Sequence, residues 1–281
     1  MFIFKKLFKN IGPITFVIIF IFFSTLQAKN LEKFNKAEKI ADYFSGILLL
    51  HDSQYEESNK FLQRLDGLEL NHINYSSKFL YSLVNSGKFE EAFKFSKKLE
   101  RRNIDNFESN LVLGVYYLKN GQDKQAQKYL LKIKNSNSVF ILNKFLSDSL
   151  LIWSDVDNKD FFESQTKINA LDKRFENLKS IETVFLHCFY KSKKADNQFE
   201  KLISNKEVNF SRYNYFYSSY LVETGRVNKA KEVIKSSLEL FPRNLLLNQQ
   251  KIDLNSKREK IDFNCQNKLH VQLEIFLLPM R

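Results

Sequence analysis

Two stretches, NSGKFEEAFKFSKKL at 85–99 and NGQDKQAQKYLLKI at 120–133, decide the fold of this 281-residue chain. Each begins with a polar turn containing glycine, continues to an alanine five positions later, and then carries apolar residues at helical spacing. Equivalent residues stand 34 positions apart: Gly87 and Gly121, Ala92 and Ala126, Leu99 and Ile133. This spacing predicts a repeated unit in which a turn separates two helices.

The repeat extends in both directions from these stretches. Three contiguous blocks begin at positions 39, 73 and 107, and later blocks are expected at 145–178, 179–210 and 211–244. Small residues at the eighth and twentieth positions let two helices approach closely, and glycine at the fifteenth suits the left-handed conformation that ends a helix. The residues expected to hold these positions are Gly46, Gly87, Ala92, Gly114, Gly121, Ala126, Gly225 and Ala230. Pro242, at the thirty-second position of the last block, is expected to end its second helix.

This pattern resembles the tetratricopeptide repeat over residues 39–244, and the whole chain is similar in character to such proteins from AT-rich alphaproteobacteria. The resemblance implies an all-α, right-handed solenoid over residues 29–260, with the first helix of each unit lining a concave wall. It also implies a protein or peptide partner held in that groove. The predicted groove residues are Tyr43, Ile47, Tyr81, Val115, Leu118, Tyr215 and Ser219. The alternative is that part of this wall packs against other units of the same chain.

Composition narrows the class of protein. With 43% hydrophobic and 15% aromatic residues the chain can form a substantial core, and only seven glycines and three prolines argue against sandwiches and barrels. The net charge of +12 comes from lysines spread along the chain without a dense basic block. We therefore expect a solvated basic surface and no nucleic-acid partner, with binding to an anionic polymer or membrane as an alternative.

The N-terminal segment at 1–28 has the layout of a secretory signal peptide. Three lysines precede an apolar run at 14–23, which is shorter than the roughly 20 residues that span a bilayer, and Ala28 ends the segment. We expect cleavage after Ala28 and a periplasmic protein. Leu26 stands where a small residue is preferred, so an uncleaved inner-membrane anchor is the alternative.

The two cysteines, Cys188 and Cys265, lie 77 positions apart without a CxxC pattern. An exported chain could pair them. We expect two buried free thiols.

No residue pattern indicates catalysis, a cofactor or a metal. The sequence lacks GxGxxG, GxxxxGK[ST] and GxSxG, and its four histidines are widely spaced. The acidic residues from Asp155 to Glu163 lack the glycine and the closing glutamate of a calcium loop, so a solvated turn is expected there. Trp153 nearby is expected to be a core residue whose N–H finds a partner.

The C-terminal residues 261–281 are expected to form a helix, and they contain an apolar run at 275–278. A solenoid normally ends with a polar outer face, so either this run docks back onto the chain or the array is shortened. The function expected overall is a non-catalytic scaffold. The helical-repeat part of an envelope enzyme or assembly complex is the alternative.

Overall fold

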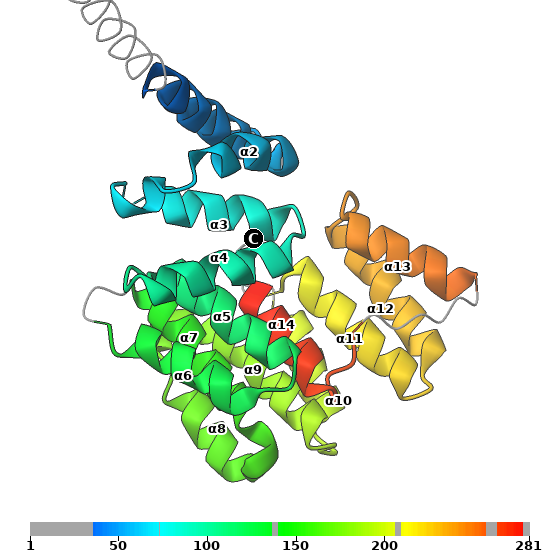
Figure 1. Ribbon diagram of the computed structural model, residues 1–281. Helices are drawn as coiled ribbons and strands as arrows, with labels where there is room; N and C mark the ends of the chain where they lie inside the picture. The colour runs from blue at the N-terminus through cyan, green and yellow to red at the C-terminus, as the bar shows by residue number, and fades with distance from the viewer. Residues whose placement is uncertain (1–35, 73, 137–139, 206–208, 257–262, 278–281) are drawn as a thin grey trace, which may run out of the picture. The chain divides into compact units, whose positions relative to one another are not determined.

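The computed structural model describes residues 36–72, 74–136, 140–205, 209–256 and 263–277 (Figure 1). Over these ranges the chain is helical and contains no strand, and successive helices pack against their neighbours in the chain, as in a helical repeat. The chain divides into two compact parts, an N-terminal part up to Ile104 and a C-terminal part from Asp105. The expected all-α fold class is confirmed at this level.

The N-terminal part is built from short helices that follow one another in space. Residues 36–51 are helical, and the helices after them pack in order, α2 on α3 and α3 on α4. Their bounds are α2 Tyr55–Leu62, η1 Gln63–Leu65, η2 Leu68–Leu70, α3 Tyr75–Asn85 and α4 Phe89–Arg101.

The C-terminal part continues the same sequential packing from α5 to α13. The helices are α5 Phe107–Lys119, α6 Asp123–Lys134, α7 Ile141–Ser154, η3 Val156–Asn158, α8 Phe161–Asn169, η4 Lys173–Phe175, α9 Glu176–Phe189, α10 Ala195–Ser204, α11 Ser211–Glu223, α12 Val227–Leu240, α13 Leu245–Asn255 and α14 Lys268–Leu277. The first helices of the predicted repeats here are α5, α7, α9 and α11.

The turns that end the helix over 36–51, α3, α5, α9 and α11 share one geometry, whereas Asp155, which follows α7, has a φ of −116°. Ser53, Gly87 and Gly121 stand 34 residues apart and have φ values of 59°, 75° and 67°. After each, the next backbone N–H donates to the carbonyl five residues earlier, at 2.8–2.9 Å. This is the Schellman arrangement, which satisfies carbonyls left free at a helix end. Lys191 and Gly225, also 34 residues apart, end α9 and α11 in the same way.

The helix starts revise two of the expected repeat boundaries. α5 and α7 begin 34 residues apart, at Phe107 and Ile141, whereas α6 and α8 begin 38 residues apart. Of the four additional residues, one therefore lengthens α7 and three lie in the connection from α7 to α8, where η3 forms and Val156 is buried, and none lies before α7. α9 begins at Glu176, so the unit expected to be compressed at 179–210 starts earlier and has close to the full period.

Close helix approach depends on complementary sizes at two repeat positions. A Cβ built on Gly46 would stand 2.6 Å from the side chain of Leu62, and one on Gly114 would stand 3.1 Å from Leu130. Each leucine lies sixteen residues after its glycine. In the intervening unit the order is reversed, with Leu80 and Ser96 at the same spacing and both buried. One large and one small residue thus fill the space in every case.

α14 departs from sequential packing, because it contacts α7, α5 and α9. In Figure 1 it lies against these helices inside the C-terminal part, with Val271 and Ile275 buried. Of the two alternatives for the C-terminal segment, the structure shows the one in which it docks back.

The expectation of free thiols is wrong. Cys188 on α9 and Cys265, three residues before α14, form a disulfide with their Cα atoms 5.8 Å apart. Both side chains are buried. The docked C-terminal segment brings together two positions that are distant in sequence, which spacing alone did not indicate.

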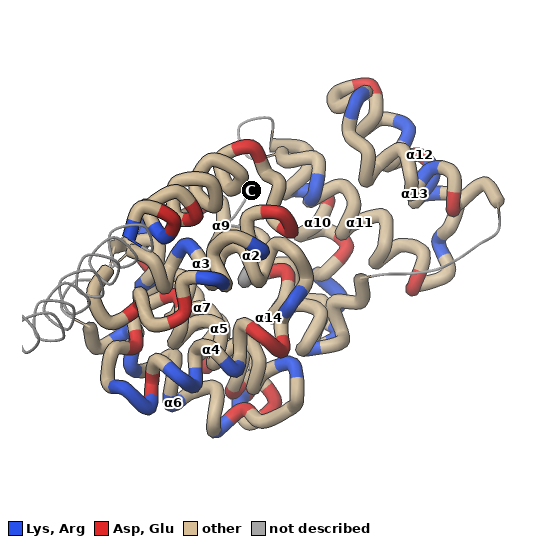
Figure 2. The backbone as a smooth tube through the Cα atoms, turned by 45° about the horizontal axis from the view of Figure 1, so that its top comes forward, with Lys and Arg blue, Asp and Glu red and all other residues tan. Residues whose placement is uncertain are grey.

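Charges of both signs are distributed over the helices of each part (Figure 2). The segment at 1–28 lies outside the described residues, among which no helix is both long and apolar enough to cross a membrane.

Candidate partner-binding surface

Three predicted groove residues lie on the N-terminal part. Tyr43 and Ile47, on the helix over 36–51, are partly exposed, and the Tyr43 ring lies 4.7 Å from the imidazole of His72. Tyr81, on α3, is 50% exposed and meets Tyr55 edge to face at 5.8 Å. The hydrogen bond between the two hydroxyls, in which Tyr81 is the donor, raises the pKa of Tyr81. Both tyrosines thus keep a defined orientation while presenting apolar surface to solvent.

The same helix carries an exposed apolar stripe beyond the predicted positions. Ile40, Phe44 and Leu48 are 58%, 60% and 66% exposed, and their spacing of four places them on one side of the helix. Phe44 lies 6.0 Å from the Tyr43 ring. We call Ile40, Tyr43, Phe44, Ile47 and Leu48 the open apolar face. Phe44 and Leu48 were not predicted, because the repeat pattern assigns Tyr43 and Ile47 to the groove on this helix. Their helical spacing is nevertheless visible in the sequence.

The predicted groove residues of the C-terminal part are mostly covered by the chain itself. Leu118 on α5 is buried and Val115 is partly buried. On α11, Tyr215 and Ser219 are buried beneath α13, from which the Gln250 amide donates to the Ser219 hydroxyl at 3.1 Å. In this part the wall of first helices therefore packs against other segments of the same chain.

α14 occupies part of that wall and is held at both ends by charge. The Lys268 ammonium lies 2.8 Å from an oxygen of Asp123 on α6 and also pairs with Asp157 in η3. Six residues later, Glu274 accepts from the Arg212 guanidinium on α11, with Nε and Oε2 2.8 Å apart. These opposite charges fix the direction in which α14 lies.

Between the charged ends the contacts are apolar, with one amide hydrogen bond. Val271 and Ile275, one helical turn apart, are buried. The Gln272 amide donates to the Trp153 carbonyl at 3.1 Å. The wall thus presents an apolar floor with a backbone acceptor, acidic groups at one end and an arginine at the other.

A buried carboxyl group lies beside this wall. Glu182 on α9 accepts from the Ser149 hydroxyl at 2.8 Å and from the Trp153 indole N–H at 3.3 Å, which confirms that Trp153 is a core residue with a partner. Burial raises the pKa of Glu182 to about 7, against the lowering effect of these two hydrogen bonds. Its described partners are neutral donors within the core, which fits a structural role.

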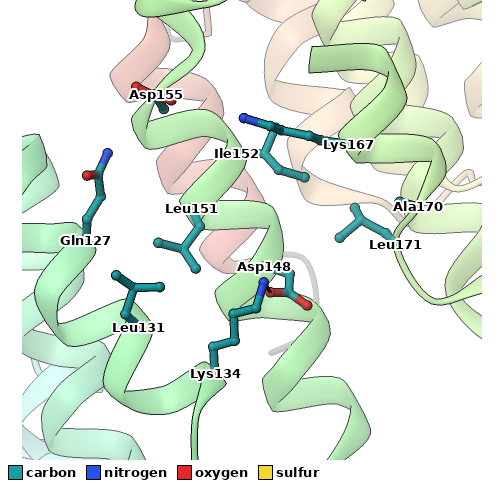
Figure 3. Close-up of a pocket in the computed structure, with 10 residues that line it drawn as sticks. All are labelled: Gln127, Leu131, Lys134, Asp148, Leu151, Ile152, Asp155, Lys167, Ala170 and Leu171. Atoms are coloured by element: carbon teal, nitrogen blue, oxygen red, sulfur yellow. Dashed lines mark ion pairs between the residues drawn. The ribbon is translucent and has the colours of Figure 1, made fainter. Parts of the chain in front are cut away.

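A surface hollow of about 470 Å³ lies between α6, α7 and α8 (Figure 3). The Lys134 ammonium and the Asp148 carboxylate pair within it at 2.9 Å, and Leu131, Leu151 and Leu171 supply apolar lining. The ten described residues that line it include no histidine, cysteine or hydroxyl side chain.

The acidic residues considered for calcium are already engaged within the chain. Asp160 caps α8 by accepting from the Glu163 N–H at 2.8 Å, and Lys159 pairs with Glu163 at 3.0 Å. Asp157 pairs with Lys268. Among the described residues no cluster of three or more histidine, cysteine, aspartate or glutamate side chains is placed to hold a metal ion.

No protein-family model matches the chain, and no curated protein is similar to it. We therefore infer function from its repeat pattern and its surfaces.

Proposed function

We propose that this chain is a non-catalytic scaffold, a right-handed solenoid of tetratricopeptide type, that binds a protein or peptide. The open apolar face carries this proposal. Three large side chains of one helix are each more than half exposed, with Tyr43 and Ile47 beside them, and such a contiguous patch on a protein surface is typical of an interaction site. Tyr81 on α3 adds a rigid, amphipathic contact.

The proposed location is the periplasm, with the solenoid either released or anchored at the inner membrane. The lysine-flanked apolar run at 14–23 supports export. The Cys188–Cys265 disulfide supports it independently, because disulfides persist in oxidising compartments and are rare in the cytosol.

Site-specific photo-crosslinking in the producing cell tests the binding proposal. A photoreactive residue at Phe44 or Tyr81 should give a discrete adduct with another protein. The adduct at Phe44 should weaken when Ile40 and Leu48 are changed to serine. Phe162 on α8 is 78% exposed and lies outside the open apolar face, so the same residue there is the matched control.

Two outcomes would count against the proposal. One is the absence of adducts from both positions while circular dichroism shows the folded helical chain. The other is an identical adduct from position 162, which would indicate that the crosslinked protein makes non-specific contacts and does not bind through the open apolar face.

A further inference from the structure

The wall on which α14 lies has the properties of a helix-binding site. We propose that it binds an amphipathic helix of another protein, and that α14 is its intramolecular occupant. This inference rests on the proposed function for the class of partner. It concerns a different surface from the open apolar face, so the crosslinking result there does not depend on it.

The charged residues of α14 pair with the wall, although at least one of them is unfavourable for the isolated helix. Lys268 is the first residue of α14, where the positive end of the helix dipole disfavours a cation. Its two carboxylate partners, Asp123 and Asp157, come from elements far away in the sequence. Arg212 on α11 receives Glu274 at the other end. Recognition of a helix in one direction explains this arrangement.

The additional residues between α7 and α8 contribute to the site. They include η3, which supplies Asp157. The repeat pattern alone does not require these residues. A site for a helix that begins with a cation does use them, because Asp157 supplies a carboxylate for that cation.

The contacts define the chemistry of the expected partner helix. It carries a cation at its start, apolar side chains three and seven residues later, an amide at four and a carboxylate at six, which are the offsets of Val271, Ile275, Gln272 and Glu274 from Lys268. Such a helix competes with α14 for the same floor and the same charges.

The disulfide favours the internal occupant. Cys265 stands three residues before Lys268 and is bonded to Cys188 on α9, so it holds α14 next to the wall at a high effective concentration. Breaking this bond leaves α14 attached only through the chain that follows α13, and a competing helix then gains access.

Exchange of one charge pair tests the proposal. The full chain with Arg212→Glu repels its own Glu274, and the probes are synthetic peptides of residues 266–281, unsubstituted or with E274R. Under reducing conditions the R212E chain should bind the E274R peptide at least tenfold more tightly than the unsubstituted peptide. Equal affinities, or no binding by a folded R212E chain, would overturn the proposal.

Arg226 provides a matched control. Its guanidinium lies 5.4 Å from the Tyr220 ring centre, as that of Arg212 does from Phe216, but it pairs with Asp196 on α10 and not with α14. The R226E chain should show no preference between the peptides. A preference equal to that of R212E would mean that charge change alone, and not the site, selects the peptide.

Hydrogen exchange on the unsubstituted chain keeps the proposal testable if R212E does not fold. With the disulfide reduced, backbone amides of α14 should exchange at least tenfold faster than those of α7 and α9, because α14 leaves the wall without global unfolding. Equal exchange rates in the three helices would show that α14 is a permanent part of the core, and would overturn the proposal. A mixture of R212E and E274R chains that dimerises would assign the site to a second copy and not to another protein.

Discussion

At the scale of single residues, the C-terminal part combines a predicted core aromatic with an unexpected buried acid. The need of Trp153 for a hydrogen-bond acceptor follows from its residue type. That the acceptor is Glu182, from the next first helix along the chain, depends on how α7 and α9 pack. A carboxyl group buried among neutral donors favours the protonated form.

Glu182 should make stability depend on pH. Its pKa in the folded chain, about 7, lies above the usual 4.5, so its contribution is fully present below about pH 4.5 and is lost as the pH rises through 7. The shift corresponds to about 3 kcal/mol. Glu182→Gln removes the charge and keeps an acceptor. We expect the variant to unfold at a higher denaturant concentration than the parent at pH 8.5, and at a similar concentration at pH 4.5.

Urea denaturation of both proteins across this pH range measures the effect. Only the difference between them is diagnostic, because other groups titrate in both. A difference that stays constant with pH would contradict the assignment.

Gly46 is required by close approach of two helices. A methyl group there would meet the fully buried Leu62 at 2.6 Å. Alanine improves helix propensity by roughly 1 kcal/mol, but overpacking costs about 1–3 kcal/mol. We expect Gly46→Ala to lower the free energy of unfolding by up to about 2 kcal/mol, the difference between these two effects. Gly114→Ala, with a closest contact of 3.1 Å, should lose less unfolding free energy. Thermal unfolding of both variants and the parent measures the effect. A melting temperature of Gly46→Ala above that of the parent would be inconsistent with this packing.

At the scale of helices and turns, one cap recurs through the chain. A residue with positive φ, followed by a hydrogen bond to the carbonyl five residues back, ends helices in both parts. Where glycine holds this place the sequence predicts it. Ser53 and Lys191 adopt the same conformation without being glycine. The helix end is therefore set by the packing of the next helix as well as by local preference.

The reversed sizes of Leu80 and Ser96 predict energetic coupling. Leu80→Ala alone should cost about 2–5 kcal/mol, because it leaves a cavity. Ser96→Leu alone should cost about 1–3 kcal/mol through overpacking. The double variant places a small residue at position 80 and a leucine at position 96, which is the order found in the neighbouring units. Its loss of unfolding free energy should therefore be at least about 1 kcal/mol smaller than the sum of the two single losses. A double-mutant cycle by chemical denaturation measures this, and additive losses would show that the two sites do not share a space.

At the scale of the whole molecule, α14 closes the C-terminal part on itself. It joins α5, α7 and α9 through one helix, and its two end charges reach α6, η3 and α11. The Cys188–Cys265 bond closes a loop between positions 77 residues apart in the sequence.

Loss of this disulfide should destabilise the C-terminal part. A loop of this length predicts a loss of about 4.5 kcal/mol on the chain-entropy account. The free energy of unfolding should therefore fall on adding dithiothreitol. The Cys188→Ser, Cys265→Ser double variant is the control, since it should be insensitive to the reductant. A parent protein whose unfolding is also insensitive would indicate that its thiols are not bonded.

Prediction from sequence succeeded where the information is local. The helical class, the glycine turns and the small contact positions are all visible in residues 85–99 and 120–133. It failed for the free thiols and for the boundaries around η3, because these depend on contacts between residues distant in the chain. Of the predicted groove residues, Leu118, Tyr215 and Ser219 are covered by the same chain. A periodic template cannot register such covering, since it assigns each position to a face without asking what packs on that face.

The sequence by itself determined that this chain forms successive helices joined by short turns, because apolar periodicity, turn glycines and small contacts act within one unit or between adjacent ones. Only the tertiary structure decided which surface stays open. α14 and α13 cover wall positions of the C-terminal part through contacts that span up to 145 residues, as between Lys268 and Asp123, whereas the helix over 36–51 keeps its apolar stripe exposed. Burial of apolar surface is favourable for any segment that can pack on that surface, whatever the distance between the two in the sequence.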